Sequence, residues 1–256
     1  MASVRFGILG PVEVRVDGRH LATAGRQREL LAALLLRPNT VVPSDELAGM
    51  VWPESPSPGL GHRLHTCVGR LRKSLAPGAA ERLVTRDPGY LLRVAPGELD
   101  SERFTVLLAE CADATRARDW TRAVHASDRA LALWRGEPLL DVSALPGRSG
   151  TAAYYRERLL HLLEHRMDAL IELGRHAEAA AALDRLVHEH PYRERFAAQH
   201  MTALSHAGRR AEALLVYRST RRTLVEALGV EPGPDLTSLH QLILEGGPIT
   251  ASFLGQ

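Results

Sequence analysis

Apolar and polar side chains between His62 and Leu75 separate onto two faces of a predicted helix. The apolar positions follow helical spacing and are Leu64, Val68, Leu71 and Leu75. The opposite face carries Arg63, Thr66, Arg70 and Lys73. Such a helix buries one stripe and exposes a row of hydrogen-bond donors, which is the geometry needed to enter a DNA major groove. Because most amphipathic helices are simply solvated on their polar side, the flanking segments decide between the two interpretations.

Two β-prone segments, Arg82–Arg86 and Tyr90–Val94, follow this helix after a break at Pro77-Gly78. The turn-forming run Asp87-Pro88-Gly89 joins them and predicts a hairpin with Arg86 beside its tip. A groove-sized helix followed by a hairpin with a cation at its apex is typical of a winged helix-turn-helix, whose arginine enters the adjacent minor groove. An arginine beside a turn is more often solvated, so its place directly behind the helix is what favours a wing.

The segments before this helix predict the rest of a small α+β domain. Val4–Leu9 and Val12–Val16 alternate apolar and polar positions, and Asp17-Gly18 predicts a tight turn before Arg19–Leu21. A leucine-rich helix is predicted over Arg26–Arg37, where a proline stops it. The chain therefore opens with an antiparallel sheet and a first helix.

A second helix is predicted from Ser44, its expected N-cap, to about Trp52-Pro53. Acidic residues in its first turn complement the helix dipole. The proline- and serine-rich stretch 53–59 is an extended connector. In winged helices of this topology, the equivalent loop lies beside DNA and can contact polymerase. The first domain is complete by about Val94.

Strand signals vanish after Ser101, and runs of Ala, Leu, Arg and Glu predict an all-helical second part beyond a linker at Pro96-Gly97. The hexapeptide Gly174–Ala179 recurs with one difference at Gly208–Ala213, an offset of 34 residues that is the period of tetratricopeptide helix pairs. Asp119–Val124 resembles an earlier, divergent copy. The predicted helices lie near residues 101–117, 120–135, 151–173, 175–189, 193–207, 209–228 and 235–245. Such stacks usually bind protein on their concave surface. The loop 136–150 is either mobile or packed on the first domain.

Charge is distributed unevenly along the chain. Residues 1–97 hold 13 Lys+Arg against 8 Asp+Glu, a net charge of +5, whereas residues 98–256 hold 19 against 22, a net charge of −3. This asymmetry is expected if only the first part approaches phosphates. The single lysine, Lys73, lies in Leu-Arg-Lys-Ser, which excludes a phosphate-loop ATPase and disfavours a Schiff-base enzyme.

Several other classes of site find little support. Cys67 and Cys111 are the two cysteines and lack the spacing of a zinc site or a disulfide framework, which suits a reducing compartment. No signal peptide or membrane-length apolar run is present, so we expect a cytoplasmic protein. His161 and His165 have a metal-chelating spacing, but no His-Glu-x-x-His motif accompanies them. We therefore expect no metal, no cofactor and no enzyme.

With these elements in place, the chain resembles the Streptomyces antibiotic regulatory protein family of transcriptional activators. The resemblance runs from about Arg5 to Leu244, and its marks are Phe6–Val14, Gln27–Ala32, Val68–Arg72, Thr85–Tyr90 and Leu99-Asp100-x-x-x-Phe104. Each mark alone is weak, whereas their combination is a strong signal. The resemblance implies an OmpR-type winged-helix DNA-binding domain over 1–96, a bacterial transcriptional activation domain of tetratricopeptide-like helices over 97–246, and a tail over 247–256. Larger members continue into an ATPase and sensor repeats, so the chain looks like a small or a truncated member.

The resemblance also implies partners. Family members bind short direct repeats overlapping the promoter −35 region, often as side-by-side dimers, and recruit RNA polymerase holoenzyme through its sigma factor and other subunits. We therefore expect a sequence-specific activator that binds double-stranded promoter DNA as a dimer and controls a secondary-metabolite (antibiotic) gene cluster. The alternative is a protein-binding adaptor whose winged helix serves protein contact. Phosphorylation of a receiver domain is not supported, because no alternating strand-helix unit precedes the winged helix.

The resemblance gives roles to individual residues. Arg70 matches the arginine that reads base edges, for which a bidentate contact to guanine is the suitable chemistry. The matched phosphate-facing positions are His62, Arg63 and Arg72, and the matched wing arginine is Arg86. Trp52 and Tyr90 match positions that donate to phosphate, although burial of an aromatic ring explains them equally well.

Two positions depart from the family pattern. Gly69 replaces a larger polar residue, and Cys67 stands where a polar residue is frequent, so each removes a contact that Arg63 and Lys73 are placed to replace. The candidate DNA-binding residues are His62, Arg63, Thr66, Gly69, Arg70, Arg72, Lys73, Arg86, Trp52 and Tyr90.

Overall fold

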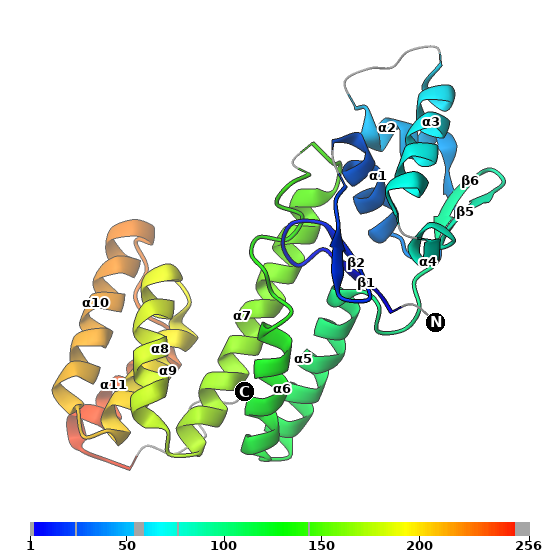
Figure 1. Ribbon diagram of the computed structural model, residues 1–256. Coiled ribbons are helices and arrows are strands. Elements are labelled where there is room, and N and C mark those ends of the chain that lie inside the picture. Colours follow the sequence, from blue (N-terminus) through cyan, green and yellow to red (C-terminus); the bar gives the residue numbers. More distant parts are fainter. Residues whose placement is uncertain (1–2, 24, 54–58, 76, 143, 249–256) are drawn as a thin grey trace. The chain divides into compact units, whose positions relative to one another are not determined.

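The computed structural model describes residues 3–23, 25–53, 59–75, 77–142 and 144–248. The chain divides into two compact units (Figure 1). Unit 1 comprises Met1–Leu108 and Arg129–Leu159, and unit 2 comprises Ala109–Asp128 and Leu160–Gln256. Most of the connector predicted at 53–59 lies outside the described residues.

The N-terminal sheet of unit 1 confirms the strands and the turn expected from alternation. Its strands are β1 (Val4–Gly7), β2 (Glu13–Val16) and β3 (Arg19–Leu21), paired antiparallel in that order. The buried side chains alternate along β1 and β2, as in a sheet with one apolar face. Asp17 and Gly18 both have positive φ, which is what a two-residue hairpin turn requires.

Three helices and a second sheet complete the winged helix, and the fold class expected from the sequence is confirmed. The helices are α1 (Arg26–Leu35), α2 (Ser44–Val51) and α3 (Leu60–Ser74). The second sheet has the order β4 (Val42–Pro43), β6 (Gly89–Leu92) and β5 (Leu83–Arg86), and all of its pairs are antiparallel. Figure 1 shows the β5–β6 hairpin, the predicted wing, beside α3.

Two local predictions in this region are wrong. The break at Pro77-Gly78 is a short helix, α4 (Pro77–Ala80), which proline tolerates at a first helical position. Ser44 is already helical and makes no capping bond, because its Oγ donates to the carbonyl of Pro88 at 3.1 Å. This contact helps to hold the start of α2 against the wing turn.

The pairing of β4 with β6 was not predicted. Val42 lies opposite Tyr90, and Pro43 lies opposite Gly89. A Cβ atom at Gly89 would lie 1.9 Å from the carbonyl oxygen of Val42, so this close approach of two backbones requires glycine.

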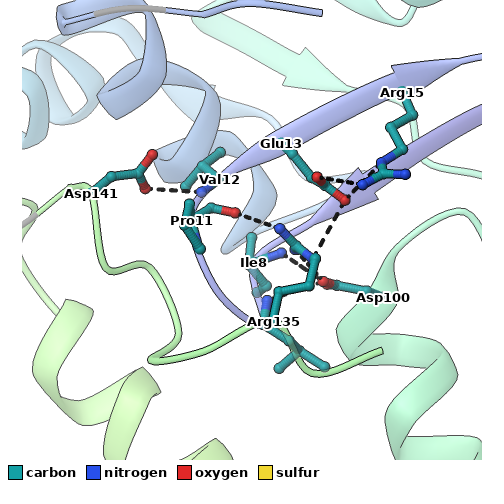
Figure 2. A network of polar contacts seen from close by, with 9 residues as sticks. Ile8, Pro11, Val12, Glu13, Arg15, Asp100, Arg135 and Asp141 are labelled. Carbon is teal, nitrogen blue, oxygen red and sulfur yellow. Dashed lines mark hydrogen bonds and ion pairs between the residues drawn. The ribbon is translucent and has the colours of Figure 1, made fainter. Parts of the chain in front are cut away.

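The loop predicted at 136–150 is packed on the N-terminal sheet within unit 1. Leu139 N donates to the carbonyl oxygens of Ile8 and Gly10 at 3.0 and 2.8 Å. Asp141 accepts a hydrogen bond from Val12 N at 2.8 Å (Figure 2). The buried side chains of this loop, Leu139, Val142 and Leu145, belong to the same core as the winged helix.

A buried carboxylate joins the first sheet to the helices that follow (Figure 2). Asp100 is 7% exposed and accepts hydrogen bonds from Ile8 N at 2.8 Å, Leu9 N at 3.0 Å and Arg135 Nη2 at 2.8 Å. Arg135 also donates to the Pro11 carbonyl at 2.8 Å. We call these groups the Asp100 network. Burial raises the pKa of Asp100, while the donors around it act in the opposite direction.

The segment predicted as a linker is also bonded to β1. Phe6 N donates to the Glu98 carbonyl at 2.8 Å, and Phe6 forms a parallel bridge with Leu99. The Arg5 side chain donates to the Gly97 carbonyl at 3.0 Å. The connection between the winged helix and the next helix is therefore held in place along its length.

The remaining helices confirm the helical second part. They are α5 (Asp100–Arg116), α6 (Trp120–Leu131), α7 (Arg148–Glu172), α8 (His176–Glu189), α9 (Glu194–His206), α10 (Arg210–Leu228) and α11 (Pro234–Glu245). Helix α6 ends before the predicted residue 135, because Arg135 N donates to the Leu9 carbonyl at 2.8 Å instead of continuing the helix. None of the helices in the described ranges is both long and apolar enough to cross a bilayer.

The internal repeat is visible in the geometry of unit 2. Gly174 and Gly208 both have positive φ just before α8 and α10, where a left-handed residue ends one helix. The arginine that follows each glycine pairs with a glutamate three residues on, Arg175 with Glu178 and Arg209 with Glu212. Local sequences that differ only at His176 and Arg210 therefore make equivalent helix starts.

Candidate nucleic-acid interface

Helix α3 has the two faces that its sequence predicts. Its buried side chains are Leu64, Cys67, Val68 and Leu71. Burial raises the pKa of the Cys67 thiol, so this residue packs as a small apolar group. The exposed side chains are His62, Arg63, His65, Thr66, Arg70 and Lys73. Because α3 contains no acidic residue, its solvent face carries positive charge and no negative charge.

A cationic hollow of about 470 Å³ lies beside this face. It is lined by Arg26, Gln27, Trp52, His62, Arg63, Thr66, Cys67 and Arg70. No carboxylate lines it, although Glu29 pairs with Arg26 at 2.6 Å. The hollow is therefore suited to an anion such as a backbone phosphate.

Arg26 is a candidate that sequence reasoning missed. It is the first residue of α1, and its Nη1 donates to the Val51 carbonyl at 2.8 Å, which fixes the guanidinium at the hollow. The sequence feature that could have indicated Arg26 is its place at a helix N-terminus, where backbone N–H groups also favour anions. The local sequence pattern, however, does not show that this N-terminus lies beside α3.

Trp52 lines the hollow and contacts the Arg63 side chain there. It is 8% exposed, and the guanidinium carbon of Arg63 lies 5.2 Å from the centre of its ring. This cation–π contact restricts the long Arg63 side chain on the exposed face. Most of the tryptophan surface is buried in the core, and the part that remains exposed helps to position Arg63 beside α3.

Among the predicted DNA-binding residues, Arg70, Lys73 and Arg86 are the arginines and the lysine whose side chains are not engaged elsewhere in the described part of the chain. Within the described ranges, none of them makes a hydrogen bond or an ion pair, and all are exposed. Arg86 is the last residue of β5, at the tip of the wing. A free guanidinium on an exposed helix face retains its full set of donors for a base edge or a phosphate.

Arg72 is placed differently from the other predicted residues. Its Nε and Nη2 donate to the Leu83 carbonyl at 3.0 and 2.7 Å, and Nη2 also donates to Thr85 Oγ1 at 2.9 Å. The side chain therefore joins α3 to β5. In this structure Arg72 braces the wing, whereas the sequence suggested a phosphate-facing position.

The remaining candidates have mixed surroundings. Tyr90 is 6% exposed, and its hydroxyl lies 3.5 Å from His65 Nδ1, so the ring belongs to the core and its oxygen faces α3. Gly69 is half-buried, and a Cβ built there meets no atom within 4 Å. A side chain at position 69 would therefore fit in the protein when DNA is absent.

The two histidines with metal-chelating spacing, His161 and His165, differ in their surroundings. His161 Nδ1 lies 3.3 Å from Glu164 Oε2, and burial lowers the pKa of His165. Among the described residues, no group of three His, Cys, Asp or Glu side chains is arranged to hold a metal ion.

Two family models match most of the chain. One, described as bacterial transcriptional activator domain, matches residues 99–244. The other, described as transcriptional regulatory protein, C terminal, matches residues 18–92.

Similar proteins cover nearly the whole chain. Regulatory protein AfsR of Streptomyces coelicolor is 43% identical over 253 residues, which are 97% of this chain and 25% of that protein. Transcriptional regulator RedD of the same organism is 36% identical, covering 96% of this chain and 72% of RedD. Regulatory protein DnrI of Streptomyces peucetius is 33% identical, covering 96% of this chain and 93% of DnrI. The chain thus spans about a quarter of the length of its AfsR relatives.

A solved structure shares the fold. It is that of Mycobacterium tuberculosis EmbR in complex with a low affinity phosphopeptide, with a TM-score of 0.91 and 32% sequence identity over 98% of this chain and 67% of that one. The winged helix, the helical repeats, both family models and these relatives agree. The chain belongs to the Streptomyces antibiotic regulatory protein family of transcriptional activators.

Proposed function

We propose that this chain binds promoter DNA in a sequence-specific manner and activates transcription, with α3 in the major groove and Arg70 as the residue that contacts a base edge. The observation that carries the proposal is the exposed face of α3, which is free of acidic residues and has Arg70 without a competing partner among the described side chains. A guanidinium in that position matches the two acceptors of guanine. Arg86 at the wing tip is suited to a narrow minor groove.

The other exposed candidates divide by role. Arg63, held by Trp52, and Arg26 face the cationic hollow and would neutralise a phosphate there. His62, Thr66, Lys73 and Gly69 complete the surface that meets the groove, and Tyr90 supports it from the core. Arg72 supports recognition by holding the wing on α3. The proposed site is therefore a reading residue within a ring of phosphate contacts.

A gel mobility assay with two arginine variants tests this division. Arg70→Ala should cost about 1–3 kcal/mol on the preferred duplex and relax the preference at one position. Arg63→Ala should weaken specific and random duplexes alike and reduce the salt dependence of binding. Equal losses on both duplexes for Arg70→Ala would remove the base-reading role, and absence of DNA binding by the unaltered chain would overturn the function.

The target sites, the partner and the regulated genes are proposed from the family to which the chain belongs. We propose direct repeats near the promoter −35 region as the target, a dimer on DNA, RNA polymerase holoenzyme as the protein partner, and a secondary-metabolite gene cluster as the regulated set. The relatives named regulatory protein or transcriptional regulator support this assignment. DNase footprinting of the protein on genomic promoters, with and without polymerase, gives the repeat spacing and the position relative to −35.

The helical part carries the proposed contact with polymerase. Exposed apolar side chains gather at the end of α10 and just beyond it, at Val225, Leu228 and Val230, and such clusters commonly mark protein contacts. Changing Leu228 and Val230 to serine should reduce run-off transcription with purified holoenzyme while DNA affinity is retained. Unchanged activation would place the contact elsewhere. Point variants suit this test better than truncation after residue 97, because residues 129–159 belong to unit 1.

A further inference from the structure

A second cavity lies in unit 2, among α8, α9 and α10. Its volume is about 360 Å³, which falls within the range of small-molecule sites. One face of α10 forms its longest wall, with Glu212, Leu215, Val216, Ser219, Thr220 and Thr223. These positions follow helical spacing over three turns, so the wall runs about 16 Å along the helix. Asp184, Val187 and His188 of α8 and His200 and Leu204 of α9 complete the lining, together with Pro191.

Two buried polar atoms belong to residues that line this cavity. His200 is 6% exposed and Thr220 is 4% exposed. Within the described part of the chain, neither His200 Nδ1 nor Thr220 Oγ1 has a hydrogen-bond partner. Buried polar groups are normally satisfied, and leaving them unpaired costs free energy. Burial lowers the pKa of His200, so at neutral pH its ring is uncharged and has one donor and one acceptor nitrogen.

The charge of the lining is negative. Asp184 and Glu212 are its acidic residues, and neither arginine nor lysine lines the cavity. Glu212 is already paired with Arg209, at 2.8 and 2.6 Å. The exposed Asp184 carboxylate, by contrast, makes no hydrogen bond or ion pair with any described residue, although its charge acts at longer range on Arg209 and His200. The cavity therefore has one carboxylate available to a cation.

The apolar part of the lining is open to a ligand. Leucine is among the residue types most often buried in folded proteins, yet Leu215 of α10 is 57% exposed. Val187, Leu204 and Val216 line the same cavity, and all are at least partly buried. A molecule with an apolar body would remove Leu215 from water.

We propose that this cavity binds a small organic cation, with an apolar body against Leu215 and Val216 and a protonated amine paired with Asp184. A hydroxyl on the ligand bonds to the His200 and Thr220 side chains. An anion is disfavoured by the two carboxylates, and the volume suits a small molecule better than a folded partner. This site is independent of the proposed DNA-binding face and of the proposed contact with polymerase.

Tyramine is a suitable probe, because it has an aromatic body, an amine and a hydroxyl. Its matched analogues are phenethylamine, which lacks the hydroxyl, para-ethylphenol, which lacks the amine, and hydroxyphenylpropionate, which has a carboxylate in place of the amine. NMR titration of the full chain measures each affinity. For tyramine we expect saturable binding with a Kd on the order of 1 mM, as for other fragments of this size. Loss of the amine should weaken binding roughly two- to fivefold, and the carboxylate should weaken it further.

Variants locate the binding. Asp184→Asn should abolish the preference for tyramine over para-ethylphenol, whereas Asp235→Asn, an equal loss of charge on α11, should retain it. Leu215→Ala should weaken the binding of every analogue and leave folding intact, because the leucine side chain is exposed. Thr220→Val should remove the preference for tyramine over phenethylamine. The proposal is overturned if tyramine shows no saturable binding, if the carboxylate analogue binds as well as the amine, or if Asp184→Asn leaves the preference intact.

Discussion

The Asp100 network allows a quantitative test of how the winged helix is joined to the helices that follow. The change Asp100→Asn keeps the shape of the side chain and replaces one acceptor oxygen with an NH₂ donor. If the amide oxygen takes the place of Oδ2, it still accepts from Leu9 N and Arg135. The amide nitrogen then faces the Ile8 N–H at 2.8 Å, donor against donor, and Ile8 N keeps only its longer contact to the remaining oxygen, at 3.0 Å.

The expected loss follows from these contacts. Losing a charge-assisted hydrogen bond costs about 1.5–3 kcal/mol, and removing one partner of a buried ion pair costs about 3–5 kcal/mol. Arg135 keeps the Pro11 carbonyl and lies 3.4 Å from Glu13, so its charge is not left alone. Burial raises the pKa of Asp100, so desolvation outweighs what the surrounding donors gain with the charged form, and the hydrogen-bond figure is a better guide than the ion-pair figure. We therefore expect the free energy of unfolding to fall by about 1.5–3 kcal/mol.

Urea unfolding followed by tryptophan fluorescence measures this loss, because Trp52 and Trp134 both lie in unit 1. Trp134 is adjacent to Arg135, and its ring centre lies 5.8 Å from that of Phe104. The matched control Asp87→Asn changes an exposed acid of the wing turn and should stay within about 0.5 kcal/mol of the unaltered protein. A loss below about 1 kcal/mol for Asp100→Asn would refute the idea that the network stabilises unit 1.

Three further predictions use other contacts. Arg72→Ala should lower the free energy of unfolding by about 1–3 kcal/mol, because the hydrogen bonds to Leu83 and Thr85 are lost. Urea unfolding measures this loss of stability. A variant that loses DNA affinity but keeps its stability would contradict the bracing role. Gly69→Ala should raise stability by about 0.5–1 kcal/mol, since a Cβ there meets open space in a helix; a lower melting temperature would contradict this. Burial raises the pKa of Asp168 from 3.8 to about 6 although Arg195 Nη2 lies 2.7 Å away. Since the folded-state pKa is the higher one, the neutral form contributes stability that is present below pH 3.8 and lost as the pH rises to about 6. The unfolding free energy of the unaltered protein, minus that of Asp168→Asn, should therefore fall across this window, and a flat or rising difference in denaturation at several pH values would show that Asp168 does not titrate there.

The sequence alone was sufficient for the long helices, the first sheet and the wing, and for the exposed position of the candidate reading residue. The spacing of Leu64, Val68 and Leu71 predicted the buried stripe of α3, and the same spacing predicted that Arg70 is exposed. The repeated hexapeptides at 174–179 and 208–213 predicted two equivalent helix starts. These features depend on residues within a few turns of one another, so periodicity and turn chemistry are enough to predict them.

Only the tertiary structure decided which distant groups meet. Val12 and Asp141 are 129 positions apart, and no local pattern indicates that the loop after α6 satisfies the backbone of the first sheet. The two-residue strand β4 is too short to show alternation, so its pairing with β6 was not predicted. Arg72 and Arg70 are both arginines on one amphipathic helix, yet the carbonyl of Leu83 engages only the former among the described contacts. Sequence periodicity predicts which face of an element is polar, whereas the partner of each polar group depends on how the chain returns to it, and that is set by packing of the whole unit.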